Sequence, residues 1–235
     1  ETIAAVATAA GQGGIGIVRL SGAEAVQIAL LITQRTTIND RFAHYAKFFD
    51  PQGKTIDDGL VIGFMGPKSF TGEDCVELQG HGGPVVLNLL LQRCLELGAR
   101  HANPGEFSER AFLNGRLDLC QAEAVADLAQ ANSEAGLKAA WQLLEGNLSR
   151  KVTTQRDALL DIRALLEAHL DFPDDEIPPE TGAELAAGLS EAAAELDGLA
   201  ASFQRGRLAR DGVRIALVGK PNVGKSSLMN ALLGR

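Results

Sequence analysis

The clearest chemical pattern in the sequence lies near residue 220. Gly219, Gly224, Lys225 and Ser226 fill every fixed position of the pattern GxxxxGK[ST], between an apolar run and the helix-forming run 227–233. Glycines at these positions let backbone N–H groups surround phosphate oxygens, and the helix that follows presents its positive end to the same charge. The pattern predicts that Lys225 binds the β and γ phosphates of a nucleotide and that Ser226 ligates Mg²⁺.

A second glycine pattern lies near the N-terminus. Gly11, Gly13 and Gly16 satisfy GxGxxG, but the strand-like run 17–20 follows them where a dinucleotide-binding fingerprint requires a helix. We therefore predict a tight turn and a close backbone approach, to a ligand or within the fold, rather than a nicotinamide or flavin site.

Composition and charge restrict the class of protein. The 235 residues are 46% hydrophobic and 22% charged, which excludes a disordered or collagenous chain and allows one large or two smaller domains. The net charge of −8 argues against coating nucleic acid by bulk charge. Residues 157–197 hold 12 acidic residues and one basic residue, which indicates a solvated helical face, whereas 198–235 hold 7 basic residues and one acidic residue.

The sequence carries few features that indicate a cellular compartment. The longest apolar run, 85–95, is interrupted by polar residues, and residues 1–10 lack the pattern of a signal peptide. We expect a cytoplasmic protein without a membrane span. Cys75, Cys94 and Cys120 are odd in number and form no CxxC pair, so reduced thiols are predicted rather than disulfides or a zinc site.

The first half of the chain has an α+β pattern. Strand-like runs at 15–20 and 59–64 are mixed with helical ones. Ser21 with Glu24 predicts a capping box at the start of one helix, and Gly98 predicts the end of a second helix over 84–97.

From Asp118 onward the pattern becomes helical. Asp118 and Gln121 form a box-like helix start. A stripe of apolar residues then predicts long helices packed on each other, prolines interrupt it at 171–179, and another helix is predicted over 182–204. The members of the stripe are Leu137, Trp141, Leu144, Leu148, Val152, Leu159, Ile162, Leu166 and Leu170. The apolar run 213–219 predicts a buried parallel strand before the phosphate loop.

Several further motifs occur together in a fixed order. They are GGIGIVRLSG at 13–22, SFTGED at 69–74, VEL at 76–78, HGG at 81–83, PGEF at 104–107, RAFLNGRLD at 110–118, QAEA at 121–124 and DFP at 171–173. With the phosphate loop in its expected place, the chain closely resembles the MnmE family, also called TrmE, of tRNA modification GTPases over essentially its whole length.

The resemblance implies three parts and one reaction. It implies a folate-binding and dimerisation domain related to aminomethyltransferases at 1–117, the first part of a helical domain at 118–210, and the first β-loop-α unit of a Ras-like G domain at 211–235. It also implies GTP-dependent placement of an aminomethyl or carboxymethylaminomethyl group on the wobble uridine of tRNA, with 5,10-methylenetetrahydrofolate as carbon donor. The implied partners are a second copy of the chain and the FAD-containing flavoprotein MnmG, which together form a heterotetramer.

By resemblance, the folate contacts fall on Arg19, Glu77 and Arg116. One carboxylate can accept hydrogen bonds from both the amino group and the ring N–H of a reduced pterin, and arginines can pair with the carboxylates of a glutamyl tail. These residue types therefore suit a reduced folate, for which 5-formyltetrahydrofolate serves as an analogue of the carbon donor. The residues alone favour structural roles instead: Arg19 as a strand residue paired with an acid, Glu77 as a solvated strand position and Arg116 as a helix-end residue. His81 is either a pocket residue or a structural residue in a turn.

The resemblance also assigns the nucleotide and ion contacts. GTP falls on Gly219, Asn222, Val223, Gly224, Lys225, Ser226 and Ser227. Mg²⁺ falls on Ser226, and a K⁺ ion that activates hydrolysis falls on Asn222. A potassium ion beside the phosphates would offset developing charge as an arginine finger does.

The chain departs from the family pattern after the phosphate loop. It carries no DxxG, no guanine-reading NKxD and no C-terminal Cys-x-Gly-Lys signature there, so we expect a truncated chain without GTP turnover of its own and assign no catalytic residue. Two alternatives stay open: a folate-binding dimerisation module without turnover, and a generic P-loop GTPase of ribosome assembly, for which no specific folate binding is expected.

Overall fold

The computed structural model describes residues 1–171, 179–211, 216–220, 223–232 and 234. The chain divides into two compact units. One consists of 1–126 with 143–149, and the other of 127–142 with 150–235.

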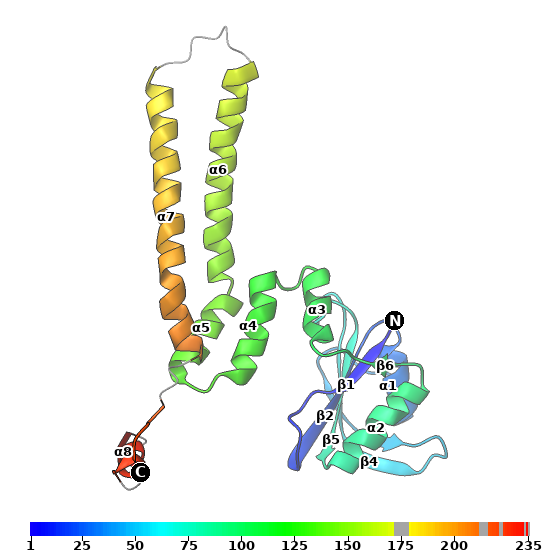
Figure 1. Ribbon diagram of the computed structural model, residues 1–235. Helices are drawn as coiled ribbons and strands as arrows, with labels where there is room; N and C mark the ends of the chain where they lie inside the picture. The colour runs from blue at the N-terminus through cyan, green and yellow to red at the C-terminus, as the bar shows by residue number, and fades with distance from the viewer. Residues whose placement is uncertain (172–178, 212–215, 221–222, 233, 235) are drawn as a thin grey trace. The chain divides into compact units, whose positions relative to one another are not determined.

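The first unit is built on a six-stranded sheet (Figure 1). The strand order is β3-β4-β5-β2-β1-β6, and neighbouring strands are antiparallel except β1 and β6, which are parallel. The strands are β1 (Ile3–Val6), β2 (Gly13–Ser21), β3 (Ala43–Phe49), β4 (Thr55–Phe64), β5 (Cys75–Gly82) and β6 (Arg100–His101). The predicted α+β pattern and both predicted strand runs are confirmed.

Two helices, α1 (Ala25–Thr33) and α2 (Pro84–Glu96), pack against this sheet and enclose its hydrophobic core. In β5, Val76 and Leu78 are fully buried in that core. Because side chains alternate along a strand, Glu77 between them points to the opposite face of the sheet. The alternation therefore gathers the polar residues of the central strands on one surface.

The glycines near the N-terminus begin a strand and allow it to pack closely against a helix. Gly13 begins β2, so a strand follows the GxGxxG pattern as predicted. Gly16 pairs with Gly80 of β5, and an added Cβ at Gly16 would lie 2.6 Å from a methyl carbon of Leu87 in α2. The close approach is therefore between strand and helix, within the core.

The predicted cap of the first helix is wrong. Ser21 is the last residue of β2, and its hydroxyl donates to the carboxylate of Glu73 at 2.8 Å instead of accepting from a helix N–H. Helix α1 begins at Ala25, and the N–H of Glu24 is bound by the hydroxyl of Thr2 at 2.9 Å. The strand continues through Ser21 because partners distant in sequence bind its side chain.

Other predicted helix boundaries are confirmed. Gly98, with a φ of 105°, follows α2. The backbone N–H of Gln121 donates to the Asp118 carboxylate at 2.9 Å, and the N–H of Asp118 donates to the Gln121 carboxamide at 2.9 Å, so the predicted box starts α4. The helices here are α3 (Glu106–Leu113) and α4 (Leu119–Gln130).

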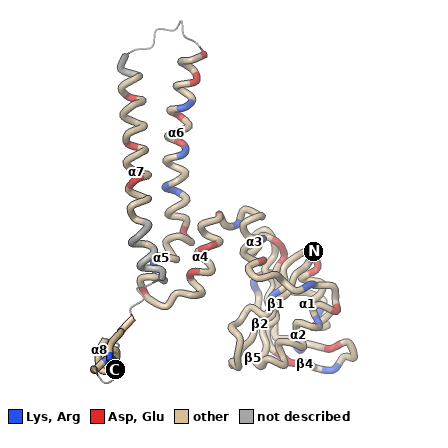
Figure 2. Tube along the Cα trace, in the orientation of Figure 1, with Lys and Arg blue, Asp and Glu red and all other residues tan. Residues whose placement is uncertain are grey.

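The second unit contains most of the long helix α6 (Asn147–Asp171) and all of α7 (Pro179–Asp211) (Figure 1). They meet at Gly188, where an added Cβ would lie 3.2 Å from Cδ1 of Ile162. Acidic positions recur along α7 (Figure 2). The side chains of Glu184 and Glu195 are exposed, as predicted for a solvated face.

The residues of the predicted apolar stripe belong to two successive helices. Helix α5 (Glu134–Leu144) ends before Gly146, whose φ of 75° separates it from α6. Trp141 and Val152 of the stripe are about half exposed. Of the prolines at 171–179, Pro179 begins α7, and the others belong to 172–178, which lie outside the described residues.

The strand predicted before the phosphate loop is not formed in its described part. Residues 216–219 have no strand structure, and Val218 is 94% exposed. A strand needs a neighbour to pair with, and no described strand pairs with this segment. Helix α8 (Lys225–Leu232) follows the loop, in agreement with the helix predicted there. Nowhere in the described chain is a helix both long and apolar enough to cross a membrane.

Candidate ligand-binding site

Arg19 of β2 and Glu77 of β5 face each other across the sheet, 58 residues apart in sequence. Nε and Nη2 of Arg19 both donate to Oε1 of Glu77, at 3.0 and 2.7 Å. The second carboxylate oxygen, Oε2, accepts from Nε2 of Gln79 at 3.0 Å. Only 13% of the Glu77 side chain is exposed, so its interpretation as a solvated strand residue is wrong, while Arg19 is indeed paired with an acid.

Two aromatic rings border the guanidinium of Arg19. Its Cζ lies 5.8 Å from the ring centroids of both Phe70 and Phe107. Phe70 belongs to the loop between β4 and β5, and Phe107 to the first turn of α3. Both residues lie inside motifs that pointed to the family, but the sequence carried no sign of their position beside Arg19.

Arg116 joins the same region through the Phe70 loop. It follows the end of α3, as a helix-end residue, and its Nε donates to the carbonyl oxygen of Ser69 at 3.1 Å. Its side chain is exposed. The structure therefore places two of the three predicted residues in direct contact and connects the third to the adjoining loop.

His81 lies four residues beyond Glu77 on β5 and is bound by Asp57. The Asp57 carboxylate accepts from the backbone N–H of His81 at 2.7 Å and lies 2.8 Å from its Nδ1. The hydrogen bond to Asp57 raises the pKa of His81. Burial opposes a low pKa at Asp57, but the hydrogen bonds from His81 outweigh it and lower that pKa. These contacts favour a structural role for His81.

A buried carboxylate holds α3 in place near the pair. Glu106, whose side chain is 7% exposed, accepts from Arg100, from Arg110 and from the backbone N–H of Asn103. Arg110 also donates to Glu73 of the Phe70 loop at 2.9 Å. The hydrogen bonds from Arg100 lower the pKa of Glu106 to about 2, although burial acts in the opposite direction. Sequence reasoning missed this network.

The phosphate loop is partly described. Nζ of Lys225 donates to the carbonyl oxygens of Gly219 and Lys220 at 2.9 and 2.6 Å, which holds the lysine over the loop. An ammonium has three donors, so one stays available for a phosphate oxygen. Gly224 has a φ of 91°, and Val223, Ser226 and Ser227 are exposed. Asn222, the predicted K⁺ ligand, lies outside the described residues.

The cysteines are free thiols, as predicted. Cys75 and Cys94 are buried and Cys120 is half-buried, and burial raises the pKa of Cys94 to about 12. The described segments bring together no three His, Cys, Asp or Glu side chains that could hold a metal ion.

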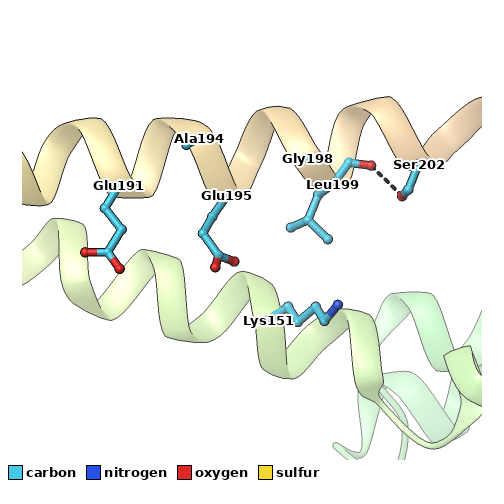
Figure 3. Close-up of a pocket in the computed structure, with 7 residues that line it drawn as sticks. All are labelled: Lys151, Glu191, Ala194, Glu195, Gly198, Leu199 and Ser202. Atoms are coloured by element: carbon cyan, nitrogen blue, oxygen red, sulfur yellow. Dashed lines mark hydrogen bonds between the residues drawn. The ribbon is translucent and has the colours of Figure 1, made fainter.

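An open groove lies between α6 and α7 (Figure 3). Lys151 of α6 and Glu191 and Glu195 of α7 line it, and the hydroxyl of Ser202 donates to the carbonyl oxygen of Leu199. The groove therefore carries charges of both signs, and its hydroxyl already has a partner within the helix.

Comparison with known families covers nearly the whole chain. Residues 2–116 match the family model "GTP-binding protein TrmE N-terminus", and residues 119–230 match "MnmE helical domain". The chain belongs to the MnmE family. Neither model describes a G domain, so the assignment of residues 211–235 to the start of one stays a prediction, as do the predicted domain boundaries.

Similar proteins carry the name tRNA modification GTPase MnmE. The protein from Pseudomonas aeruginosa strain UCBPP-PA14 is 53% identical over 235 residues, which is all of this chain and 51% of that protein. The protein from Chromobacterium violaceum is 52% identical over 233 residues, which is 99% of this chain and 52% of its own length. This MnmE-family chain thus spans about half the length of the relatives it matches.

Proposed function

We propose that the chain binds a reduced folate beside Glu77 and contributes it to modification of the wobble uridine of tRNA. The observation that carries the proposal is the direct pairing of Arg19 with Glu77, next to Phe70 and to the loop that Arg116 holds. Glu77 offers a carboxylate for the donors of a pterin, the rings offer apolar contact, and the arginines offer charge to a glutamyl tail. The proposed carbon donor is 5,10-methylenetetrahydrofolate.

The remaining parts of the proposal concern the nucleotide and the partners. GTP would bind the loop 219–227, with Mg²⁺ at Ser226 and K⁺ at Asn222, and the loop residues that are described fit a phosphate because Lys225 stands at the N-terminus of α8. Two copies of the chain would form a homodimer, and the FAD-containing MnmG would join them in a heterotetramer that acts on tRNA. The membership in the MnmE family and the relatives' name support this assignment.

A thermal melt tests the folate part of the proposal. At a concentration of roughly a hundred times its Kd, 5-formyltetrahydrofolate should raise the Tm by about 5 °C or more, because a ligand of the folded state stabilises it by mass action. A p-aminobenzoylglutamate control, which carries the tail without the pterin, should give a much smaller shift. An unchanged Tm at millimolar 5-formyltetrahydrofolate would remove the folate assignment.

A titration with GTP and Mg²⁺ tests the nucleotide part. The substitution Lys225→Ala should weaken binding by about tenfold or more, because it removes a charge-assisted contact to phosphate. The matched control is Lys220→Ala, which removes the same charge from the neighbouring variable position and should weaken binding less than about threefold. Equal affinities of the Lys225→Ala variant and the unmodified chain would contradict the nucleotide assignment.

A further inference from the structure

The hydrogen bonds on Glu77 are distributed unevenly between its two oxygens. A carboxylate oxygen has two lone-pair sites in its plane. Both sites of Oε1 are used by Arg19, whose Nε and Nη2 donate to this one atom at 3.0 and 2.7 Å. One site of Oε2 is used by Gln79. The remaining site on Oε2 is therefore the one that can accept a further donor without displacing Arg19 or Gln79.

The donor edge of a reduced pterin has the same form as the guanidinium of Arg19. Its amino group and adjacent ring N–H lie side by side and point the same way, as two N–H groups of a guanidinium do. A carboxylate that binds this edge in the fork arrangement needs one acceptor site on each oxygen. Oε2 has that site, whereas Oε1 has it only after a donor of Arg19 withdraws.

We infer that Arg19 competes with the pterin edge for the carboxylate of Glu77, and that this competition selects ligands that carry an anionic tail. The inference rests on the proposed folate site. A pterin without a tail must displace the guanidinium and offers it no new partner. The free energy needed to break the ion pair with Glu77 therefore weakens its binding in full. A folate displaces the same group and supplies carboxylates with which the guanidinium pairs again.

The surroundings of the pair suit such an exchange. Gln79 holds Oε2 independently of Arg19, so the carboxylate keeps an orienting contact when the arginine moves. The Arg19 side chain is 30% exposed and therefore has a route to solvent, whereas Glu77 at 13% is largely enclosed. Phe70 and Phe107 stand beside the guanidinium and remain there as apolar walls for a flat ring.

The test compares two ligands on three forms of the full chain by calorimetry. The ligands are 5-formyltetrahydrofolate and a tetrahydropterin that has no benzoylglutamate. Replacing Arg19 by methionine, which keeps the apolar stem, should strengthen binding of the tail-less pterin by about tenfold and weaken binding of 5-formyltetrahydrofolate by about tenfold. Lys47→Met, at an exposed position on β3 of the same sheet, should change neither affinity.

The possible outcomes separate this inference from the proposed site. If the unmodified chain binds 5-formyltetrahydrofolate but Arg19→Met binds the tail-less pterin no more tightly than before, the competition is refuted and the folate site stands. If the unmodified chain binds no 5-formyltetrahydrofolate, the proposed site itself fails. Arg19→Gln is a second variant, which tests the same competition if Arg19→Met does not fold. Its carboxamide donates fewer hydrogen bonds than a guanidinium, so it should strengthen binding of the tail-less pterin by less than Arg19→Met does.

Discussion

Replacing Glu106 with alanine is expected to lower the free energy of unfolding by about 3 kcal/mol, because it removes a buried acceptor that two arginines and a backbone N–H share. Glu106 accepts from two arginines and one backbone N–H, and each of its oxygens receives two donors. Its loss leaves Arg110, which is 13% exposed, with one fewer acceptor and frees the N–H of Asn103. Urea denaturation of both proteins measures the difference.

The same carboxylate should make stability depend on pH. The pKa of Glu106 is about 2 in the folded chain, against an ordinary value of 4.5. Because the folded pKa is the lower one, the stabilisation is fully present above pH 4.5 and is lost as the pH falls from 4.5 toward 2. The stability difference between the unmodified chain and the neutral variant Glu106→Gln should therefore shrink over that range.

Glu109→Ala is the matched control for Glu106. Glu109 lies on the same helix and is exposed, so its loss should change the free energy of unfolding by less than about 0.5 kcal/mol. A Glu106→Ala chain that unfolds at the same urea concentration as this control would show that the network does not hold α3.

The second large effect is expected at Glu77. Its replacement by alanine should weaken binding of 5-formyltetrahydrofolate by about a hundredfold, because two charge-assisted hydrogen bonds from the pterin lose their acceptor. Glu77→Gln should lose nearly as much affinity, since its amide nitrogen faces the donors of the ligand with further donors. The folded chain should tolerate both changes, because the partner Arg19 is 30% exposed and can turn toward solvent.

Local features of the sequence predicted much of the fold. The box at Asp118 and Gln121 and the stop at Gly98 depend on residues near in sequence, and both are confirmed. The box at Ser21 failed because its hydroxyl is bound by Glu73, 52 residues away. A local pattern cannot predict a competing partner that only the folded sheet supplies.

The candidate site shows the same division between local and distant contacts. Resemblance to the family selected Arg19 and Glu77, but their contact depends on the register of β2 against β5, which residue types alone do not specify. Gln79 was accessible to prediction, because it lies two residues from Glu77 on the same face of a strand. Phe107 was not, because α3 carries it to the sheet from a distant part of the chain.

Folate binding at Glu77 is tested by a calorimetric titration of 5-formyltetrahydrofolate into the unmodified chain, Glu77→Ala and Asp58→Ala. Asp58 is the matched control because it is a carboxylate of the same sheet that binds the hydroxyl of Tyr45. We expect one saturable site per chain for the unmodified protein and for Asp58→Ala, and binding about a hundredfold weaker for Glu77→Ala. Equal affinity in the Glu77→Ala chain would contradict folate binding at Glu77.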